Sequence, residues 1–410
     1  MGTPTADTAG SPAEDWLTPV SVSIPVTIFA LSALAYPLAV APALGITDAQ
    51  RTTWILGLYL LPAVASIGMT WYFRMPLIVG WSGPAIIFLA SASGVATYSD
   101  MIGAMMVTGI LLIMLGVSGL TAKLSAFIPA PIIFGVVAGS ILPFLINAFN
   151  FLGEAPVFIG IVLTSWLVVR RYLDPRVPAV LAAFAVGLAL AWLMGETDGV
   201  STASFLPVIE PTWPTFSLSA VITIAPVFII LIAVSSNLSG SLIVKNAGFD
   251  PPRKTIDIVS GVGVIAGSLF GTIPLAMATN LNSLTTSADA GPMRRRHLSV
   301  YVSAIGFLFI AGAAAIAADL PNLIPMSLLL SVAALAMLGV FIQMLGQVST
   351  GLIKIGPVVA LAVALSDLSL FGLGAFFWAI VFGTLVTRFL EADALKQHCA
   401  MMEDSDRWCR

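Results

Sequence analysis

Residues 75–87 read MPLIVGWSGPAII and residues 273–286 read IPLAMATNLNSLTT, and these two stretches decide the fold. Each begins as an extended apolar run and then changes character. In the first, a Gly-Pro pair stops the run and places Pro84 in the first turn of a short apolar helix. In the second, Asn280 is the expected N-cap of a polar half-helix. Neither stretch reaches the roughly 20 apolar residues of an ordinary spanning helix, so we predict two interrupted spans whose extended parts face each other.

The composition is that of a polytopic membrane protein. Of the 410 residues, 59% are hydrophobic and 9% are charged, and the mean hydropathy is +1.03. Soluble globular domains contain about 25% charged residues. We therefore expect membrane lipids to surround the protein. The net charge is −3 and the sequence has no basic patch, so we expect no nucleic-acid partner. No basic region precedes the first apolar run, so no cleaved signal peptide is expected.

Apolar runs between Gly, Pro and charged residues divide the chain into fourteen segments. With a cytoplasmic N-terminus and every segment crossing, all Lys and Arg residues except Arg51 fall on the cytoplasmic side, as the positive-inside rule requires. This holds only if both interrupted segments cross. Seven crossings per half make the second half enter from the opposite side, so the repeat is inverted. The segments lie near 20–44, 53–72, 76–92, 97–118, 124–148, 154–170, 177–195, 216–241, 255–270, 273–288, 298–318, 322–347, 351–366 and 368–389.

We therefore expect an all-α protein of the inner membrane with both termini in the cytoplasm, in which spans 3 and 10 each consist of a short β-strand and a half-helix. A polar stretch that contains Glu196, Asp198 and Glu210 separates the two halves. The expected divisions are a cytoplasmic tail at 1–19, a first repeat at 20–195, an extracellular linker at 196–215, a second repeat at 216–389 and a cytoplasmic tail at 390–410.

Three motifs carry a family resemblance. Residues 80–85 read GWSGPA and are similar to AWSTPG, and residues 235–240 read SSNLSG and are similar to SQNLPG, with GFDPP following at 248–252. Residues 280–286 read NLNSLTT and stand in the place of NLAAITA. Through these motifs the chain resembles the benzoate/proton symporter (BenE) family over roughly residues 24–389.

The resemblance implies a fold related to the uracil permease, with fourteen spans in a seven-plus-seven inverted repeat, and frequently a homodimer. It also implies a core domain formed by 20–118 and 216–318, and a gate domain formed by 124–195 and 322–389.

The chain departs from the family pattern at the site itself. The family's Gln is Ser236 here, its Pro is Ser239, and two of its alanines are Asn282 and Ser283. Small hydroxyls replace a long amide on one wall, while the other wall gains polarity. Benzoate as the substrate is therefore left open.

The candidate site lies between the two interrupted segments at 75–87 and 273–286, which we call the two breaks. The half-helix that follows each break presents unpaired N–H groups at its N-terminus, and these favour an anion such as a carboxylate. The residues of each break that face the site form one lip of it. The alternative for each serine is a bond to a neighbouring carbonyl, and for Trp81 simple packing. Gln343 is interpreted as a structural contact of the gate. The expected substrate-binding residues are Trp81, Ser82, Gly83, Pro84 and Ala85 on one lip, Asn280, Leu281, Asn282 and Ser283 on the other, Ser236 and Asn237 at the side, and Tyr36 as an aromatic wall.

The coupling of transport is open at this level. No Asp or Glu stands in the middle of a predicted span, and Asp257 and Asp289 are interpreted as solvated charges near the cytoplasmic ends of spans. Transport coupled to a proton, a weak acid that carries its own proton, and uncoupled movement all remain alternatives.

The function we expect is secondary active transport of a small organic anion, an aromatic carboxylate like benzoate, by alternating access. The alternatives on the same fold are a nucleobase such as uracil or xanthine and an inorganic anion. A channel would need a continuous polar pore. An enzyme would need a catalytic or metal-binding set, and both histidines, His297 and His398, lie in predicted cytoplasmic segments. We expect no cofactor, no metal and no catalytic residue.

Overall fold

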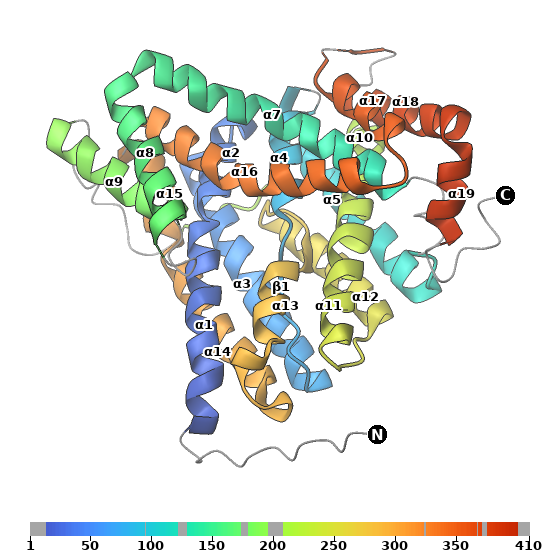
Figure 1. Cartoon of the computed structure of the whole chain (residues 1–410), viewed down its shortest axis with the longest axis horizontal. Coiled ribbons are helices and arrows are strands. Elements are labelled where there is room, and N and C mark those ends of the chain that lie inside the picture. Colours follow the sequence, from blue (N-terminus) through green and yellow to red (C-terminus); the bar gives the residue numbers. More distant parts are fainter. Residues whose placement is uncertain are drawn as a thin grey trace.

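The computed structural model describes residues 14–94, 96–121, 129–173, 179–195, 208–323, 325–366, 368–370 and 375–400. Helices make up most of it (Figure 1). The elements of the first half are α1 (Glu14–Ser32), α2 (Ala35–Leu44), α3 (Asp48–Phe73), β1 (Val79–Trp81), α4 (Gly83–Ser91), η1 (Ala92–Gly94), α5 (Tyr98–Ser118), α7 (Ala130–Glu154), α8 (Pro156–Tyr172) and α9 (Ala179–Met194).

The second half begins with α10 (Leu218–Ile229), which continues as a π-helix, η2 (Ile230–Leu238), and ends as α11 (Ser239–Asn246). The remaining elements are α12 (Arg253–Leu269), β2 (Leu275–Met277), α13 (Thr279–Thr285), η3 (Ala288–Ala290), η4 (Met293–Arg295), α14 (His297–Gly312), α15 (Ala314–Leu323), α16 (Met326–Thr350), α17 (Ile355–Ala364), α18 (Ala375–Leu390) and α19 (Ala392–Ala400).

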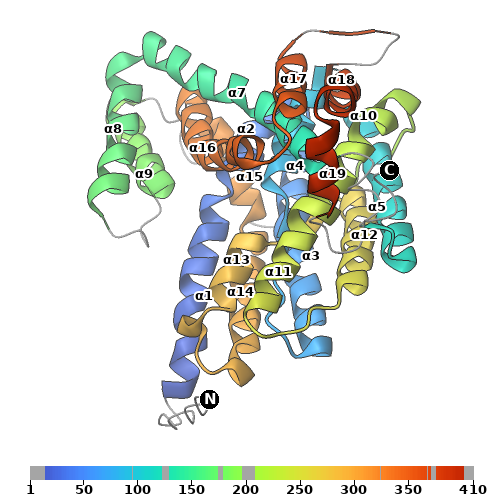
Figure 2. The ribbon, with the colours of Figure 1, turned by 45° about the vertical axis from the view of Figure 1, so that its right-hand side comes forward.

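The helices pack in two groups. One group joins α1, α3, α5, α10, α12 and α14, and the other joins α7, α8, α9, α16, α17 and α18. In Figure 1 the long helices α7 and α16 of the second group run across the upper ends of α1 and α3. Figure 2 shows α8 and α9 on the opposite side of the molecule from α5 and α12. Each group contains elements from both halves of the chain.

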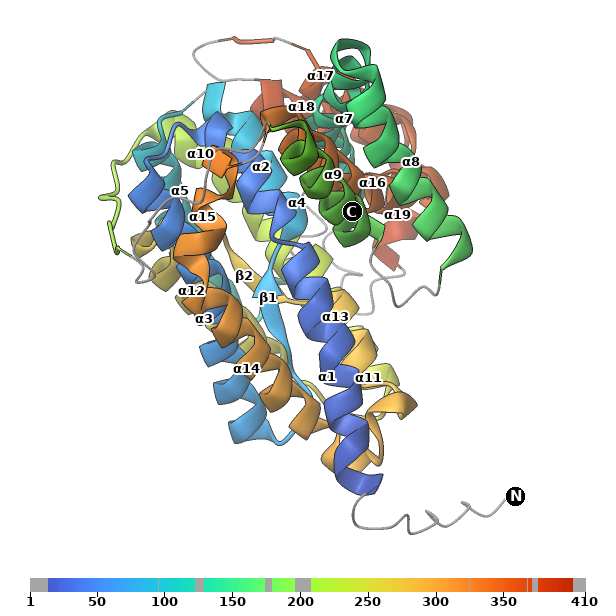
Figure 3. The ribbon, with the colours of Figure 1, turned by 90° about the vertical axis from the view of Figure 1, so that its left-hand side faces the viewer.

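The two interrupted stretches meet in the middle of the molecule, where β1 and β2 form an antiparallel two-stranded sheet (Figure 3). Gly80 stands opposite Ala276 at its centre. Beyond the strand ends, Ala278 N donates to Ile78 O at 3.1 Å, and Ser82 N donates to Pro274 O at 3.4 Å. Extended backbone inside a membrane protein must find such partners. The prediction that both stretches are extended and face each other is confirmed.

The two half-helices begin differently. Ser82 is the N-cap of α4, where its Oγ accepts a hydrogen bond from Ala85 N at 3.4 Å, and Pro84 lies in the first turn as predicted. The prediction that Asn280 caps the other half-helix is wrong, because α13 begins at Thr279 after Ala278. Ala278 N still bonds across the sheet, so the strand runs directly into the helix without a separate capping residue.

The number of membrane crossings stays a prediction. By length and composition, six of the described helices could cross a membrane, or up to eight if each bent helix pair is one span. The other predicted spans coincide with shorter helices such as α9 and α17, or with the two strand-and-half-helix segments. The chain is a multi-pass membrane protein, and its division into fourteen spans and an inverted repeat stays a prediction.

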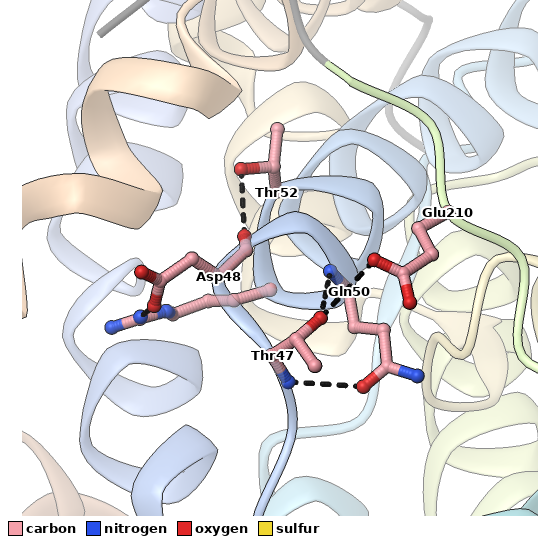
Figure 4. Close-up of polar contacts among 6 residues, drawn as sticks. Thr47, Asp48, Gln50, Thr52 and Glu210 are labelled. Atoms are coloured by element: carbon pink, nitrogen blue, oxygen red, sulfur yellow. Dashed lines mark hydrogen bonds and ion pairs between the residues drawn. The ribbon is translucent and has the colours of Figure 1, made fainter.

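The described part of the predicted linker begins at residue 208 and is hydrogen-bonded to the start of α3 (Figure 4). Thr47 and Gln50 form a capping box, in which Gln50 N donates to Thr47 Oγ1 at 3.1 Å. Thr47 Oγ1 also donates to Glu210 Oε2 at 3.3 Å, and Glu210 N donates to Thr53 Oγ1 at 2.7 Å. The linker thereby holds the two halves together at one end of the first helix group.

Candidate functional site

A cavity of about 160 Å³ lies where the two interrupted segments meet. Its walls come from α1, α2, α3, η2, α14 and α16, together with both strands and the starts of α4 and α13. The described residues that line it include no Asp, Glu, Lys, Arg or His. The lining consists of Phe29, Ala30, Ala33, Tyr36, Leu58, Tyr59, Pro62, Gly80, Trp81, Ser82, Gly83, Pro84, Ser235, Ser236, Met277, Ala278, Thr279, Asn280, Leu281, Phe307, Val340, Gln343 and Met344.

The first break supplies one lip of the cavity. Ser82 is buried, and its N–H is used by the sheet. Pro84 has no N–H, and the first bond inside α4 runs from Ile86 N to Ser82 O at 3.1 Å. The Gly83 N–H therefore precedes the helical bonds, as the first amides of any helix do. This lip offers one free backbone donor beside the ring of Trp81.

The second break supplies three backbone donors. The first bond within α13 runs from Asn282 N to Ala278 O at 2.8 Å. The N–H groups of Thr279, Asn280 and Leu281 precede it and have no partner inside the helix. All three residues line the cavity. The second lip is therefore richer in donors than the first.

Aromatic rings form part of the cavity wall. The rings of Tyr36 and Trp81 meet edge to face with centroids 5.9 Å apart, a favourable geometry for aromatic pairs. The Tyr36 hydroxyl donates to Ala336 O of α16 at 2.7 Å. Tyr59 and Phe307 make a second edge-to-face pair at 6.4 Å. A planar ring can pack on this wall while its polar edge reaches the amides of the lips.

The structure brings eight of the twelve predicted site residues to the cavity and leaves four outside its lining. Ala85 is fully buried within α4. Ser283 is exposed, and its Oγ donates to Asn280 O at 2.6 Å, which is the local bond expected of a helical serine. The eight are Tyr36, Trp81, Ser82, Gly83, Pro84, Ser236, Asn280 and Leu281, and the four are Ala85, Asn237, Asn282 and Ser283.

Asn282 holds the two breaks together and does not face the cavity. Its Oδ1 accepts from Ile78 N at 3.0 Å, and its Nδ2 donates to Ile78 O at 2.7 Å. The side chain is fully buried. It thus acts as one more backbone unit at the end of β1, because an amide offers a donor and an acceptor in the geometry of a peptide group.

Asn237 makes a comparable contact with β2, and behind it lies Asp257. Met277 N donates to Asn237 Oδ1 at 2.9 Å, and Asn237 Nδ2 donates to Asp257 Oδ1 at 2.9 Å. The prediction that Asp257 is a solvated interfacial charge is wrong, since the residue is 7% exposed. Glycines let α12 and α5 pack with their backbones in contact, as at Gly109 and Gly261, and this close packing encloses the carboxylate. Asp289 is exposed, as predicted.

Sequence reasoning missed part of the lining. Gln343, interpreted as a structural contact, lies on the cavity with Val340 and Met344, and no hydrogen bond to its amide is found within the described residues. A spacing of three and four residues puts these three on one face of α16. That spacing is present in the sequence, but it does not indicate which face of a spanning helix points to the site.

The comparison with known families decides what kind of protein this is. A family model described as benzoate membrane transport protein matches residues 12–389. The chain belongs to this family, BenE. The E. coli (strain K12) inner membrane protein YdcO is 28% identical over 344 residues, covering 83% of this chain and 87% of that protein. The benzoate membrane transport protein of Acinetobacter baylyi is 24% identical over 349 residues, covering 83% and 86%.

Solved structures resemble this BenE protein in fold. The transmembrane domain of the cyanobacterial bicarbonate transporter BicA has a TM-score of 0.56 at 18% identity and covers 94% of this chain and 97% of that one. The structure of SLC26A9 has a TM-score of 0.59 at 13% identity and covers 94% and 66%. Family and fold together indicate a membrane transporter and not an enzyme.

Proposed function

We propose that this BenE protein is a secondary active transporter of a small aromatic carboxylate of the benzoate type, moved together with a proton. The substrate binds in the cavity between the two breaks. The core, residues 20–118 and 216–318, moves against the gate, residues 124–195 and 322–389, and exposes the cavity to each side of the membrane in turn.

The observation that carries the proposal is the make-up of the cavity. An engineered cavity of about 150 Å³ in another protein holds benzene, so a volume of about 160 Å³ fits one six-membered ring. The aromatic wall around Trp81 and Tyr36 suits the face of that ring. The amides of Gly83 and Asn280, on opposite lips, suit its carboxylate, because backbone donors at helix starts favour anions.

The contact between Tyr36 and α16 supports movement of the core against the gate. Tyr36 belongs to the core and Ala336 to the gate, and one hydrogen bond of 2.7 Å joins them beside the cavity. A single neutral bond contributes about 1 kcal/mol. It can close the site in one state and break in another at little cost.

The neutral lining of the cavity supports proton coupling. The cavity holds no cationic side chain among its described residues. The negative charge of a bound carboxylate is therefore not compensated by the protein. Moving one charge against a potential of 100 mV costs about 2.3 kcal/mol. A proton that travels with the anion cancels this term, so symport permits accumulation in a cell that is negative inside.

A second candidate is supported by a different observation. Asn280 and Gln343 place two side-chain amides on a lining that also carries the hydroxyls of Ser82 and Ser236. Such groups match the donor and acceptor edge of an uncharged nucleobase, and the uric acid permease PucK of Bacillus subtilis is 25% identical over 274 residues, covering 59% of this chain and 62% of that protein. The transporter BicA, with its similar fold, makes an inorganic anion the third alternative.

Counterflow in proteoliposomes tests the proposal. Vesicles loaded with unlabelled benzoate should take up labelled benzoate faster than protein-free vesicles, which measure the passive entry of the weak acid. Unlabelled uracil, urate or bicarbonate inside the vesicles should not drive this uptake. If urate or uracil exchanges and benzoate does not, the nucleobase alternative replaces the proposal, and bicarbonate exchange alone would favour the inorganic anion.

A further inference from the structure

A buried carboxylate lies behind the cavity and takes no part in lining it. Asp257 is on the second turn of α12 and is 7% exposed. Its Oδ1 accepts from Asn237 Nδ2 at 2.9 Å, and its Oδ2 accepts from Thr121 Oγ1 at 2.9 Å. Both partners are neutral. Acidic side chains inside membrane proteins are costly and mark ion or proton pathways.

The side-chain amide of Asn237 connects this carboxylate to the substrate site. Its oxygen must face Met277 N, which can only donate, and its nitrogen must face the carboxylate, which can only accept when ionised. Ser260 Oγ lies within reach of both ends of this amide, since it can accept from Asn237 Nδ2 at 3.1 Å and donate to Asn237 Oδ1 at 3.3 Å. Met277 ends β2 and lines the cavity. Two hydrogen bonds therefore separate Asp257 from a residue of the binding site.

No cation neutralises Asp257 among the described residues. Lys254 precedes it by one turn, but its side chain lies over Gly119 at the end of α5. On α5, Tyr98 and Asp100 stand at the opposite end, since Tyr98 bonds Gly271 beyond the far end of α12. On α3, the apolar cluster around Ile256 and Met69 intervenes.

The remaining charged and titratable groups on the elements packed against α12 also point away. Tyr72 and Arg74 at the end of α3 are exposed, and Asp48, Arg51 and Tyr59 belong to its earlier turns. Neither η2 nor β2 carries a titratable residue. Lys245 of α11 and Arg253 at the start of α12 are exposed. Lys123 lies outside the described residues.

We propose that Asp257 is the proton-binding group of this transporter and that Asn237 transmits its protonation to β2. The inference rests on the proposed symport and names the group that carries the proton. It places that group outside the substrate cavity, in contact with the strand that forms one lip. Proton and substrate thus bind at separate places that share β2.

The physical step is a change in one hydrogen-bond pattern. When Asp257 is ionised, the Asn237 amide donates to a charge, and such bonds are roughly twice as strong as neutral ones. The amide is then held in the orientation that fixes Met277 N. When the carboxylate takes up a proton, its new O–H becomes a donor that competes with Met277 N for Asn237 Oδ1. The hold on β2 weakens, and the new O–H is the only covalent bond that forms.

The first test needs no substrate. Infrared difference spectra of the purified protein, recorded between mildly alkaline and mildly acidic pH, should show the carbonyl stretch of a newly protonated carboxyl group. Asp257→Asn should remove this band. Asp289→Asn, which replaces an exposed carboxylate, should retain it and lose only the small signal of Asp289 itself. If Asp257→Asn retains the wild-type band in full, Asp257 does not take up the proton and the proposal is overturned.

The second readout tests the connection to β2. Hydrogen–deuterium exchange of the peptide that contains Met277, corrected for the intrinsic effect of pH, should be faster in the acidic state of the wild type. In Asp257→Asn it should not depend on pH. If the corrected exchange rate at Met277 does not change with pH in the wild type, the role given to Asn237 is refuted. A merely structural Asp257 predicts that result.

Transport separates this inference from the proposed function. With wild-type protein, a proton gradient directed into the vesicles should drive benzoate accumulation at a higher initial rate than in protein-free vesicles, toward a limit of about tenfold per pH unit for one proton. Asp257→Asn should lose this acceleration and keep counterflow, which needs no net proton movement, and Asp289→Asn should keep both. Accumulation that Asp257→Asn accelerates above the rate in protein-free vesicles under the proton gradient, or that the wild type accelerates under a sodium gradient, would overturn the proposal. Failure of wild-type counterflow contradicts the substrate instead, and the infrared result still decides Asp257.

Discussion

The two breaks differ in how their outer edges are satisfied. A two-stranded sheet leaves one edge of each strand unpaired, and in a membrane protein those groups need partners. At β1, Val79 N donates to Ser66 Oγ at 2.9 Å, and Ser66 Oγ donates to Val79 O at 3.1 Å. At β2, Met277 N donates to Asn237, which is bonded to Asp257. One edge is closed by a neutral hydroxyl of α3, and the other by an amide attached to a carboxylate.

This difference assigns different roles to the halves of a site that looks symmetric in the backbone. The β1 edge has no titratable group among its bonded partners, so its geometry is independent of pH. The β2 edge depends on the charge of Asp257. A moving part of the mechanism is therefore expected at β2 and α13, with β1 and α4 as the fixed part.

The largest expected effect comes from the residue that joins the two breaks. Asn282→Ala removes the acceptor of Ile78 N and one of the two donors to Ile78 O, which keeps its bond from Ala278 N. The buried N–H left unsatisfied costs about 1–3 kcal/mol. We expect a clear fall in the melting temperature in detergent and a lower yield of monodisperse protein. Ser283→Ala, on the exposed neighbouring position, is the matched control and should melt like the wild type. Equal melting of both variants would show that Asn282 does not hold the sheet.

The next test compares the two edges directly. Ser66→Ala and Asn237→Ala each leave one strand edge without its partner, so each should lower the stability by about 1–3 kcal/mol. The loss in Ser66→Ala should be the same at acidic and alkaline pH. The loss in Asn237→Ala should shrink at acidic pH, where the wild-type contact is already weakened. Melting curves of both variants across pH measure this, and two parallel pH profiles would erase the distinction between the edges.

Much of this arrangement could be predicted from the sequence, because backbone breaks have local causes. Gly83-Pro84 stops an apolar run wherever it stands, and the mismatch between two short segments and a bilayer is evident from length alone. The strand pairing and six of the cavity residues follow from those signals, while Tyr36 and Ser236 are predicted from their places on other spans. The family resemblance led to the BenE assignment that the family comparison confirms.

The parts that could not be predicted depend on the rotation of a helix about its own axis. Asn237 and Ser236 are adjacent in sequence, yet Ser236 lines the cavity and Asn237 bonds β2. They belong to η2, a π-helix, and such segments shift the angular register of a helix and recur at functional sites. Asp257 stands one turn from the start of α12, a position that the sequence alone indicates as solvated. Its burial depends on how closely α12 approaches α5.

A smaller effect is expected where the first break reaches the gate. Tyr36→Phe removes the hydrogen bond to Ala336 O and keeps the ring contact with Trp81. Loss of about 1 kcal/mol changes the balance between closed and open states by a factor of about 5. We expect the counterflow rate to change by up to this factor with little change in substrate affinity. Tyr72→Phe, at an exposed tyrosine, is the control, and an altered affinity without an altered rate would place Tyr36 in substrate binding alone.

The smallest effect concerns Gln343, and it separates the substrate classes. The amide lines the cavity from α16. Gln343→Met keeps the length and the apolar stem but removes both hydrogen-bonding groups. A ring that binds by its face and by a carboxylate at the two lips should lose at most about threefold in affinity, less than one neutral hydrogen bond. A nucleobase that uses the amide should lose about tenfold or more, since a buried polar edge is left unpaired.

Gln347→Met, one turn further along α16 and outside the lining, is the matched control. Benzoate binding that falls tenfold in Gln343→Met would show that the gate contributes a direct polar contact, and the neutral lips at β1 and β2 would then not suffice to hold the anion.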